Sequence, residues 1–489
     1  MEKKISKQTI KRDFLIFILI FLLLVTLSLS TSTFGVTDVG DYAGVAKFFS
    51  GEFHAKIRSS HSFLYGVIHF PLLLLIKNFI ILKIINLIYL FLLILSVYFM
   101  SGKNSKTLFL FLLSPVVWYM GPWVNSIQLS SLLFLEGYYF MKKFEDTEKL
   151  SLLFISGLLV GLSWAFWDSI LFFSIILGIC FLYDKKFYNF FFFGLFVLIG
   201  LMPKLIIDQM LFNFPFYGII RYFFGMVTSI MWGGIYGSMG SSNKIFDLFL
   251  LLILIPIFTY KIFSKKSLSK NKKSLIFIGL SLFLIFLNFQ IRYLLFIFPI
   301  ILLSLVSLIN KKEFRLQLII SIILSLLVIT PYIIQINYST NTPEFKSLIT
   351  HFKNIEIYNN QEEILIQDLR EISMDFPNEV FIVGNQADSY SLLAMIYWGD
   401  DIREFVSIED YSLSLENKSD IFSKKIYFTP NIAERREIWI GGGIGKNSND
   451  DTNYSSIRFA ISDEDNISLQ NFRLVKEYEK LSVFEKVGN

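Results

Sequence analysis

The chain has 489 residues, 54% of them hydrophobic, and a mean hydropathy of +0.57. Soluble domains contain about 45–50% apolar residues, and here the excess gathers in runs of about twenty residues, the length that crosses a bilayer; the composition therefore excludes an ordinary soluble protein. The net charge of +5 does not indicate a nucleic-acid partner, because most basic residues lie in short loops, where they set membrane orientation.

The first apolar run, residues 14–30, follows five basic residues. A cleavable signal peptide begins in the same way, but Ser28 and Ser30 match the small residues of a cleavage site only weakly. Many apolar runs follow downstream. The sequence therefore predicts an uncleaved first helix with its N-terminus in the cytoplasm.

Two aspartates come next. Asp38 and Asp41 open a stretch that continues with Tyr42, Ala46 and Gly51. An unpaired acid within the bilayer costs about 3 kcal/mol, so acids beside a span are functional candidates. A carboxylate beside an acceptor hydroxyl can take its proton as general base. The alternative for Asp41 is that it caps a following helix.

Positive-inside counting orders the later spans. Five basic loops all lie on the cytoplasmic side only if the segment 61–77 does not cross the membrane. We therefore expect this segment to lie along the outer membrane interface as a helix interrupted at Pro71. If this segment crossed, every later loop would invert. The basic loops are 103–106, 142–149, 184–186, 261–273 and 311–315. The spans are then 14–30, 80–100, 107–120, 128–141, 151–166, 169–183, 189–203, 246–262, 274–288, 293–309 and 316–336.

Polar side chains gather in two outer turns of this topology. In the turn 121–127, Asn125 is followed closely by Gln128, and both side chains can bind a sugar or orient a base, or else satisfy helix ends. Asp168 follows Trp164 and Trp167. A carboxylate flanked by indoles is typical of sugar binding, although interfacial tryptophans are also common without a ligand.

Cations are the third outer feature. Arg292 and Tyr293 open the span 293–309, and an arginine there can form a two-pronged contact with a phosphate or simply extend to the interface. Arg221 lies in the outer loop 204–245, with Lys204 as a weaker partner. The four histidines have no metal-ligand spacing.

Composition changes sharply near residue 337, which predicts two domains, 1–338 and 339–489. The second is polar, and its patterns predict a helix over 362–372 and strands over 379–383, 425–428, 437–440 and 472–475. The glycines of 441–446 predict a turn, and their spacing is wrong for a phosphate-binding loop. The fold class is membrane all-α: a bundle of about 11 transmembrane helices with a large first outer loop, plus a small C-terminal α/β extracytoplasmic domain that binds the acceptor, covers the site or only stabilises the chain.

Together these residues resemble the polytopic GT-C glycosyltransferases, which include protein mannosyltransferases, aminoarabinose transferases and lipopolysaccharide core glycosyltransferases. The resemblance covers about residues 10–310. Its elements are the order of Asp38, Tyr42, Ala46 and Gly51, the amphipathic stretch 64–75, the Pro-led span with a polar outer turn at 115–128, the elements at Pro203 and 212–215, and Arg292 with Tyr293 ahead of Pro299.

The resemblance implies a multi-pass cell-membrane enzyme that moves a sugar from a polyprenyl-phosphate donor to a lipid, glycan or protein acceptor on the outer face. It implies Asp38 as the base, with Asp41 as helper or substitute, and Arg292 as the group that holds the donor phosphate. No metal is required, although Asp38 and Asp41 could bind a divalent cation weakly.

The sequence also departs from the class. Asn125 or Gln128 stands where the class often has an acid in the second outer turn, and no basic residue neighbours Asp168 in sequence. The rival interpretations are a transporter or lipid flippase and a non-catalytic membrane scaffold. Inverted repeats and broken midplane helices, which are typical of transporters, are not evident in the sequence.

Overall fold

The computed structural model divides into two compact units. The first comprises Met1–Thr31, Ile84–Ile206 and Ser229–Ile357, and the second Ser32–Lys83, Ile207–Thr228 and Tyr358–Asn489. The structure describes residues 7–30, 57–58, 62–76, 80–183, 186–212, 214–220, 222–223, 248, 251–262, 272–287, 291–334, 368, 371–372, 374–376, 379, 381–383, 405–407, 443–444, 458–462, 471–479 and 481–487.

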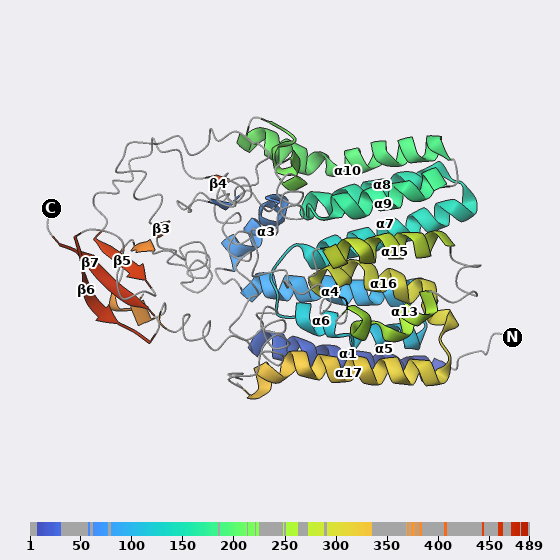
Figure 1. Ribbon diagram of the computed structural model, residues 1–489, viewed down its shortest axis with the longest axis horizontal. Coiled ribbons are helices and arrows are strands. Elements are labelled where there is room, and N and C mark those ends of the chain that lie inside the picture. The colour runs from blue at the N-terminus through green and yellow to red at the C-terminus, as the bar shows by residue number, and fades with distance from the viewer. Residues whose placement is uncertain are drawn as a thin grey trace. The chain divides into compact units, whose positions relative to one another are not determined.

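The first unit is a bundle of helices that run along a common direction (Figure 1). Each predicted span coincides with helical residues, and the span 80–100 matches α4 at both ends. The helices are α1 (Lys7–Ser30), α4 (Ile80–Met100), α5 (Ser105–Leu112), α6 (Pro115–Met120), α7 (Ile127–Thr147), α8 (Leu150–Phe166), α9 (Ile170–Tyr183), α10 (Phe187–Phe212), α13 (Pro256–Ile262), α15 (Lys272–Leu287), η1 (Ile291–Tyr293), α16 (Leu294–Leu305), η2 (Val306–Leu308) and α17 (Lys311–Ile334).

Three described helices are long and apolar enough to cross a membrane on length and composition: Arg12–Ser30, Ile80–Met100 and Phe187–Met210. Shorter apolar helices accompany them at Leu150–Phe166, Ile170–Leu182 and Leu294–Leu308. The architecture is that of a helical membrane protein, and the number of crossings stays a prediction.

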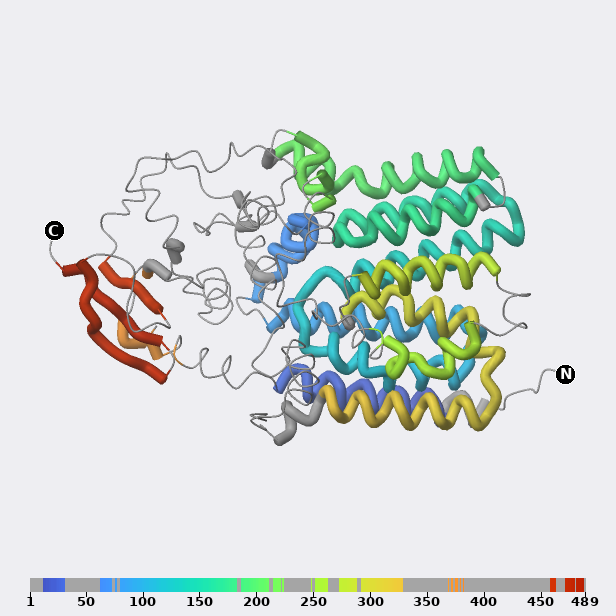
Figure 2. The backbone as a smooth tube through the Cα atoms, viewed as in Figure 1, coloured from blue at the N-terminus to red at the C-terminus, as the bar shows by residue number. Residues whose placement is uncertain are grey.

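Helix α16 is the core of the bundle. It contacts α5, α6, α7 and α15, so a late segment of the chain inserts among early ones, as the colours along the tube in Figure 2 also show. Its apolar residues from Leu294 to Leu302 are all buried. Pro299 lies inside this helix without ending it.

The predicted span 107–120 was wrong as a single helix, because the structure breaks it into α5 and α6. Ser114 has extended backbone angles, and its hydroxyl accepts a hydrogen bond from the amide of Val117. Pro115 follows at the first helical position, where its missing N–H leaves no bond unmade. The carbonyl of Leu113, at the end of α5, accepts a hydrogen bond of 2.9 Å from the Ser325 hydroxyl on α17.

Helices α8 and α10 approach each other at glycines. A Cβ atom added to Gly161 would lie 2.1 Å from the Val197 carbonyl oxygen, and one added to Gly200 would lie 2.2 Å from the Leu158 carbonyl oxygen. Only glycine permits such a close approach of two backbones. The contact fixes the register of α10 along α8.

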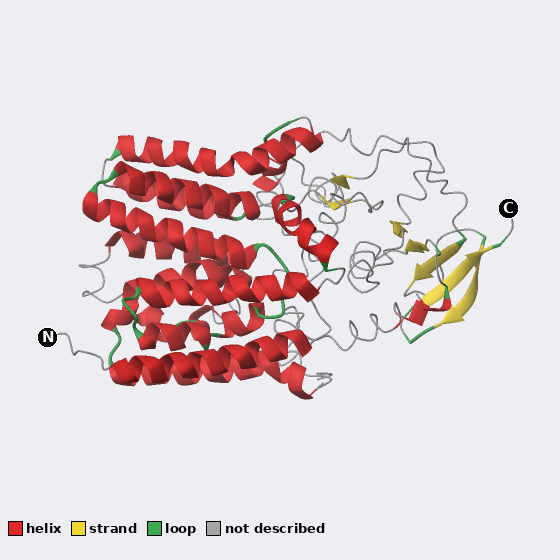
Figure 3. Cartoon of the chain, turned by 180° about the vertical axis from the view of Figure 1, so that it is seen from behind, coloured by secondary structure: helices red, strands yellow, loops and turns green. Residues whose placement is uncertain are grey.

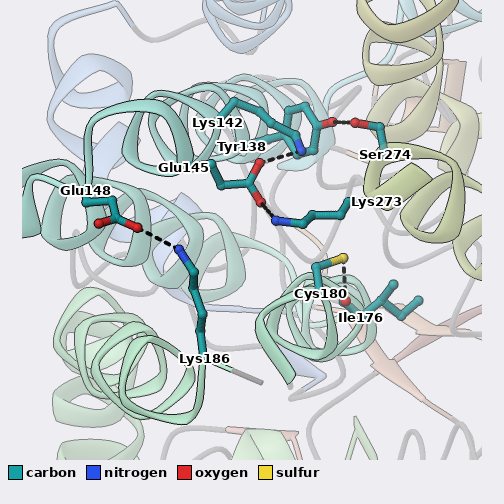
Figure 4. A network of polar contacts seen from close by, with 9 residues as sticks. All are labelled: Tyr138, Lys142, Glu145, Glu148, Ile176, Cys180, Lys186, Lys273 and Ser274. Carbon is teal, nitrogen blue, oxygen red and sulfur yellow. Dashed lines mark hydrogen bonds and ion pairs between the residues drawn. The ribbon is translucent and has the colours of Figure 1, made fainter. Parts of the chain in front are cut away.

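The basic turns gather at one end of the bundle. Figure 4 shows part of this end, where Glu145 on α7 contacts both Lys142, at 2.8 Å, and Lys273 on α15, at 3.1 Å. Glu148 pairs with Lys186 at 2.8 Å. At the same end Asp13 accepts a hydrogen bond from Ser105, Lys106 reaches the carbonyl of Ile309, and Lys261 pairs with Glu313. The contacts agree with the predicted alternation of spans, while the side of the membrane that this end faces stays a prediction.

The second unit contains α3 (Leu64–Leu75) and the strands, which Figure 3 distinguishes by colour. Helix α3 has the bounds of the expected amphipathic stretch, and its 12 residues extend about 18 Å. That this segment does not cross the membrane stays a prediction. The predicted interruption at Pro71 was wrong, since Pro71 lies inside the helix. The strands are β1 (Ile57–Arg58), β2 (Phe381–Val383), β3 (Phe405–Ser407), β4 (Gly443–Ile444), β5 (Phe459–Ser462), β6 (Phe472–Glu477) and β7 (Ser482–Lys486).

Five strands form one sheet in the order β3-β2-β5-β7-β6, with β2 parallel to β3 and β5, and β7 antiparallel to β5 and β6. The expected C-terminal sheet is present, and the strands predicted at 379–383 and 472–475 correspond to β2 and β6. The described residues of the predicted helix 362–372, which are 368, 371 and 372, are helical. Those predicted at 425–428 and 437–440 lie outside the described residues. The turn predicted at 441–446 was wrong in part, because Gly443 and Ile444 form β4, antiparallel to β1.

Candidate functional site

The turn between α6 and α7 lies at the end of the bundle opposite the basic turns. Helix α7 begins here and has 21 residues, so about 31 Å separates its two ends. The turn is packed closely against α1, because a Cβ atom added to Gly121 would lie 2.7 Å from the side chains of Leu24 and Ser28. This close packing fixes the path of the polar residues that follow.

Asn125 and Gln128 are buried in this turn, with 2% and 0% of their surface exposed. The Asn125 Oδ1 atom accepts a hydrogen bond from the Ile127 amide at 2.8 Å, and the Gln128 Nε2 atom donates to the carbonyls of Met120 and Trp123. One polar atom of each side-chain amide therefore hydrogen-bonds to backbone groups at a helix end, which is the alternative to sugar binding that the sequence left open. The other halves, Asn125 Nδ2 and Gln128 Oε1, have no hydrogen-bond partner within the described part of the chain.

Arg292 lies over this turn. Its guanidinium carbon is 5.9 Å from the centre of the Trp123 ring and 5.8 Å from that of Tyr293, so the half-buried cation is held against aromatic faces. Trp123 in turn contacts Tyr119 at 4.9 Å. Arg292 thus lies against two aromatic rings at this end of the bundle, and its phosphate contact stays a prediction.

Aromatic contacts connect Arg292 to the turn between α8 and α9. Trp167 lies 5.2 Å from Tyr293, ring centre to ring centre, and stacks on Phe296 at 4.7 Å. The Trp167 amide donates to the carbonyls of Ser163 and Trp164, which ends α8 at this point. The predicted turn at Trp167 and Asp168 is therefore present, and it lies at the same end of the bundle as Arg292.

Asp168 forms a buried ion pair with Lys204. The Lys204 Nζ atom is 3.2 Å from Oδ1 and donates to Oδ2 at 3.3 Å, and both side chains are 3% exposed. The sequence gives no basic neighbour to Asp168, yet the fold supplies one from α10. The outer loop expected from residue 204 was also wrong at its start, because α10 continues through Pro203 to Phe212.

The Gly161–Gly200 contact explains this pair. Helices α8 and α10 are parallel neighbours there, and Lys204 lies one helical turn beyond Gly200. A lysine side chain at that position reaches Asp168, which lies two residues beyond the end of α8. Lys204 therefore pairs with Asp168 in this structure, and its expected assistance to a phosphate contact stays a prediction.

Four predicted site residues, Asp38, Asp41, Tyr42 and Arg221, lie outside the described residues, as does the weak cation site expected at the two aspartates. Elsewhere in the described ranges, no group of three or more His, Cys, Asp or Glu side chains is placed to hold a metal ion. Sequence reasoning missed Lys83, which is 1% exposed in the first turn of α4. A single lysine inside an apolar run was the available signal.

No protein-family model matches the sequence, and the search of curated proteins found no match to it. Among solved structures, ArnT from Cupriavidus metallidurans bound to undecaprenyl phosphate is similar, with a TM-score of 0.62 and 11% identity, over 97% of this chain and 98% of ArnT. Its apo state has a TM-score of 0.61 and 12% identity, with the same coverage. The chain thus shares the fold of ArnT over nearly its whole length, in agreement with the fold that the resemblance implied for about residues 10–310.

Proposed function

We propose that the chain is a membrane glycosyltransferase that takes its sugar from a polyprenyl-phosphate donor. The observation that carries the proposal is the position of Arg292, held between aromatic rings at the end of the bundle opposite the basic turns. The solved neighbour ArnT binds undecaprenyl phosphate, a lipid of the same class. A guanidinium beside aromatic rings suits a lipid phosphate, because its planar donors can form a two-pronged contact with phosphate oxygens.

The reaction we propose is an inverting displacement on the outer face. The acceptor hydroxyl gives its proton to Asp38, with Asp41 as helper, and its oxygen forms a bond to the anomeric carbon. The bond from that carbon to the phosphate oxygen breaks, and its electron pair stays with the phosphate. Arg292, with Arg221, stabilises the charge that develops on this leaving group.

The aromatic and polar groups around Arg292 would then receive the donor sugar. Trp167 and Tyr293 offer apolar ring faces beside the cation. Because Asp168 is paired with Lys204, its part in this scheme is to hold the Trp167 turn in place. A divalent cation at Asp38 and Asp41 remains an optional part of the proposal.

The proposal is tested by transfer in nanodiscs with the full chain. Purified protein is incubated with a panel of polyprenyl-phosphate sugars, and the lipid products are identified by mass spectrometry. Asp38→Asn should abolish transfer while donor binding persists, whereas Arg292→Ala should weaken donor binding itself. If the chain were a flippase or a scaffold, Asp38→Asn would leave its function unchanged. Wild-type protein that binds none of the donor lipids would refute the proposal.

A further inference from the structure

The turn between α6 and α7 contains a set of polar atoms that its own hydrogen bonds do not use. Besides Asn125 Nδ2 and Gln128 Oε1, the Trp123 Nε1 atom has no hydrogen-bond partner among the described residues. All three side chains are at least 98% buried. An unsatisfied buried polar group costs about 1–3 kcal/mol, so three within six residues indicate that a polar group from outside completes the site.

The orientation of the two amides is fixed by their other contacts. Gln128 Nε2 faces two carbonyl oxygens, which only a donor can satisfy, so Oε1 is the free acceptor. Asn125 Oδ1 faces a backbone amide, so Nδ2 is the free donor. The indole N–H of Trp123 is a second donor. The turn thus offers two donors and one acceptor.

Each of these three atoms can bind a hydroxyl group, which has one O–H and two lone pairs. An ammonium group has three donors and no acceptor, and would meet two N–H groups that it cannot satisfy. A carboxylate has no donor for Gln128. None of the three side chains carries a charge, and the nearby cation is Arg292, whose guanidinium lies over the Trp123 ring.

We propose that Trp123, Asn125 and Gln128 bind hydroxyl groups of an uncharged donor sugar, which makes the chain selective for a neutral glycose over an amino sugar or a uronic acid. The inference rests on the proposed function, since Arg292 must hold the phosphate for the attached sugar to reach this turn. It extends that function from a lipid-linked donor to the chemical class of the sugar.

The test measures lipid binding by native mass spectrometry of the full chain. The ligands are undecaprenyl phosphate without sugar, its glucose, mannose and galactose derivatives, and the matching amino sugars and uronic acids. For wild-type protein we expect at least one neutral glycolipid to bind about 10-fold more tightly than the sugar-free lipid, as two or three hydrogen bonds allow.

Two variants remove the free atoms and keep the contacts within the turn. Trp123→Phe deletes Nε1 and leaves an aromatic ring for Tyr119 and Arg292, and Asn125→Asp replaces Nδ2 and keeps Oδ1 for the Ile127 amide. Each should reduce the preference for the neutral glycolipid by about 5-fold, and Asn125→Asp should also raise the binding of the amino sugars. Ser281→Ala is the control, because it removes another buried, unpartnered polar atom from α15.

The outcomes separate this inference from the function on which it rests. If wild-type protein does not bind undecaprenyl phosphate or any glycolipid, the proposed function fails and the inference with it. If the sugar-free lipid binds but a neutral sugar adds nothing, or charged sugars are preferred, only the inference is overturned. Unchanged preferences in both variants would also overturn it and assign the free atoms to an ordered water.

Discussion

The buried pair of Asp168 and Lys204 makes a quantitative prediction. Lys204→Met keeps the length of the side chain but leaves the carboxylate of Asp168 without its cation at a position that is 3% exposed. Removing one partner of a buried ion pair typically costs about 3–5 kcal/mol, because the remaining charge stays desolvated. We therefore expect the free energy of unfolding to fall by about 3 kcal/mol or more.

A double-mutant cycle isolates the interaction. Asp168→Asn together with Lys204→Met removes both charges, and we expect the pair of changes to cost about 2 kcal/mol less than the sum of the single changes. The assay is equilibrium unfolding in mixed micelles, followed by far-UV circular dichroism. If Lys204→Met alone cost less than about 1 kcal/mol, the value typical of solvated surface pairs, the buried ion pair would be refuted.

Three further predictions follow from described contacts. Gly161→Ala should destabilise the bundle by about 1–3 kcal/mol, since its Cβ would lie 2.1 Å from a carbonyl oxygen of α10. The control is Gly194→Ala, whose Cβ would meet open space, and it should be neutral or slightly stabilising in the same unfolding assay. Arg292→Lys should weaken undecaprenyl phosphate binding about 10-fold in native mass spectrometry, and Arg292→Ala about 100-fold, because a lysine keeps the positive charge but cannot form two parallel hydrogen bonds to one phosphate. Equal losses of affinity in the two variants would contradict a two-pronged contact. Hydrogen bonds and nearby cations lower the pKa values of the Asp375 and Glu485 carboxyl groups. The stability that these carboxylates contribute is therefore present above their unfolded pKa values and is lost as the pH falls through their folded pKa values. Amide exchange in β6 and β7 of the full chain should accelerate in acid, and an acceleration toward high pH alone, after correction for intrinsic exchange, would contradict this sign.

Much of the helical framework was predictable, because each span carries its own local signal. The run 80–100 is apolar apart from a few residues such as Lys83 and Asn86, and it coincides with α4. The break between α5 and α6 also had a signal, a serine followed by a proline, but uniform apolarity concealed it. The extension of α10 was missed since a proline usually ends a helix, and here Pro203 is accommodated inside it.

The candidate site was predictable only in part. Arg292, Asn125 and Gln128 are at the same end of the bundle, as the alternation of spans implied. The partner of Asp168 was not predictable, because Lys204 is far away in sequence and its approach depends on the register of two helices at Gly161. Interhelical register is a property of packing, and no local pattern encodes it.

The two-residue ladder between β1 and β4 limits how the chain can be shortened. Its strands come from opposite ends of the sequence, and Ile57 and Arg58 pair with Ile444 and Gly443. A protein truncated before the polar C-terminal region would leave the backbone groups of β1 without their partners. A defect of such a deletion would thus report the loss of this ladder as readily as the loss of the C-terminal region itself, and point substitutions are the sounder way to separate the two.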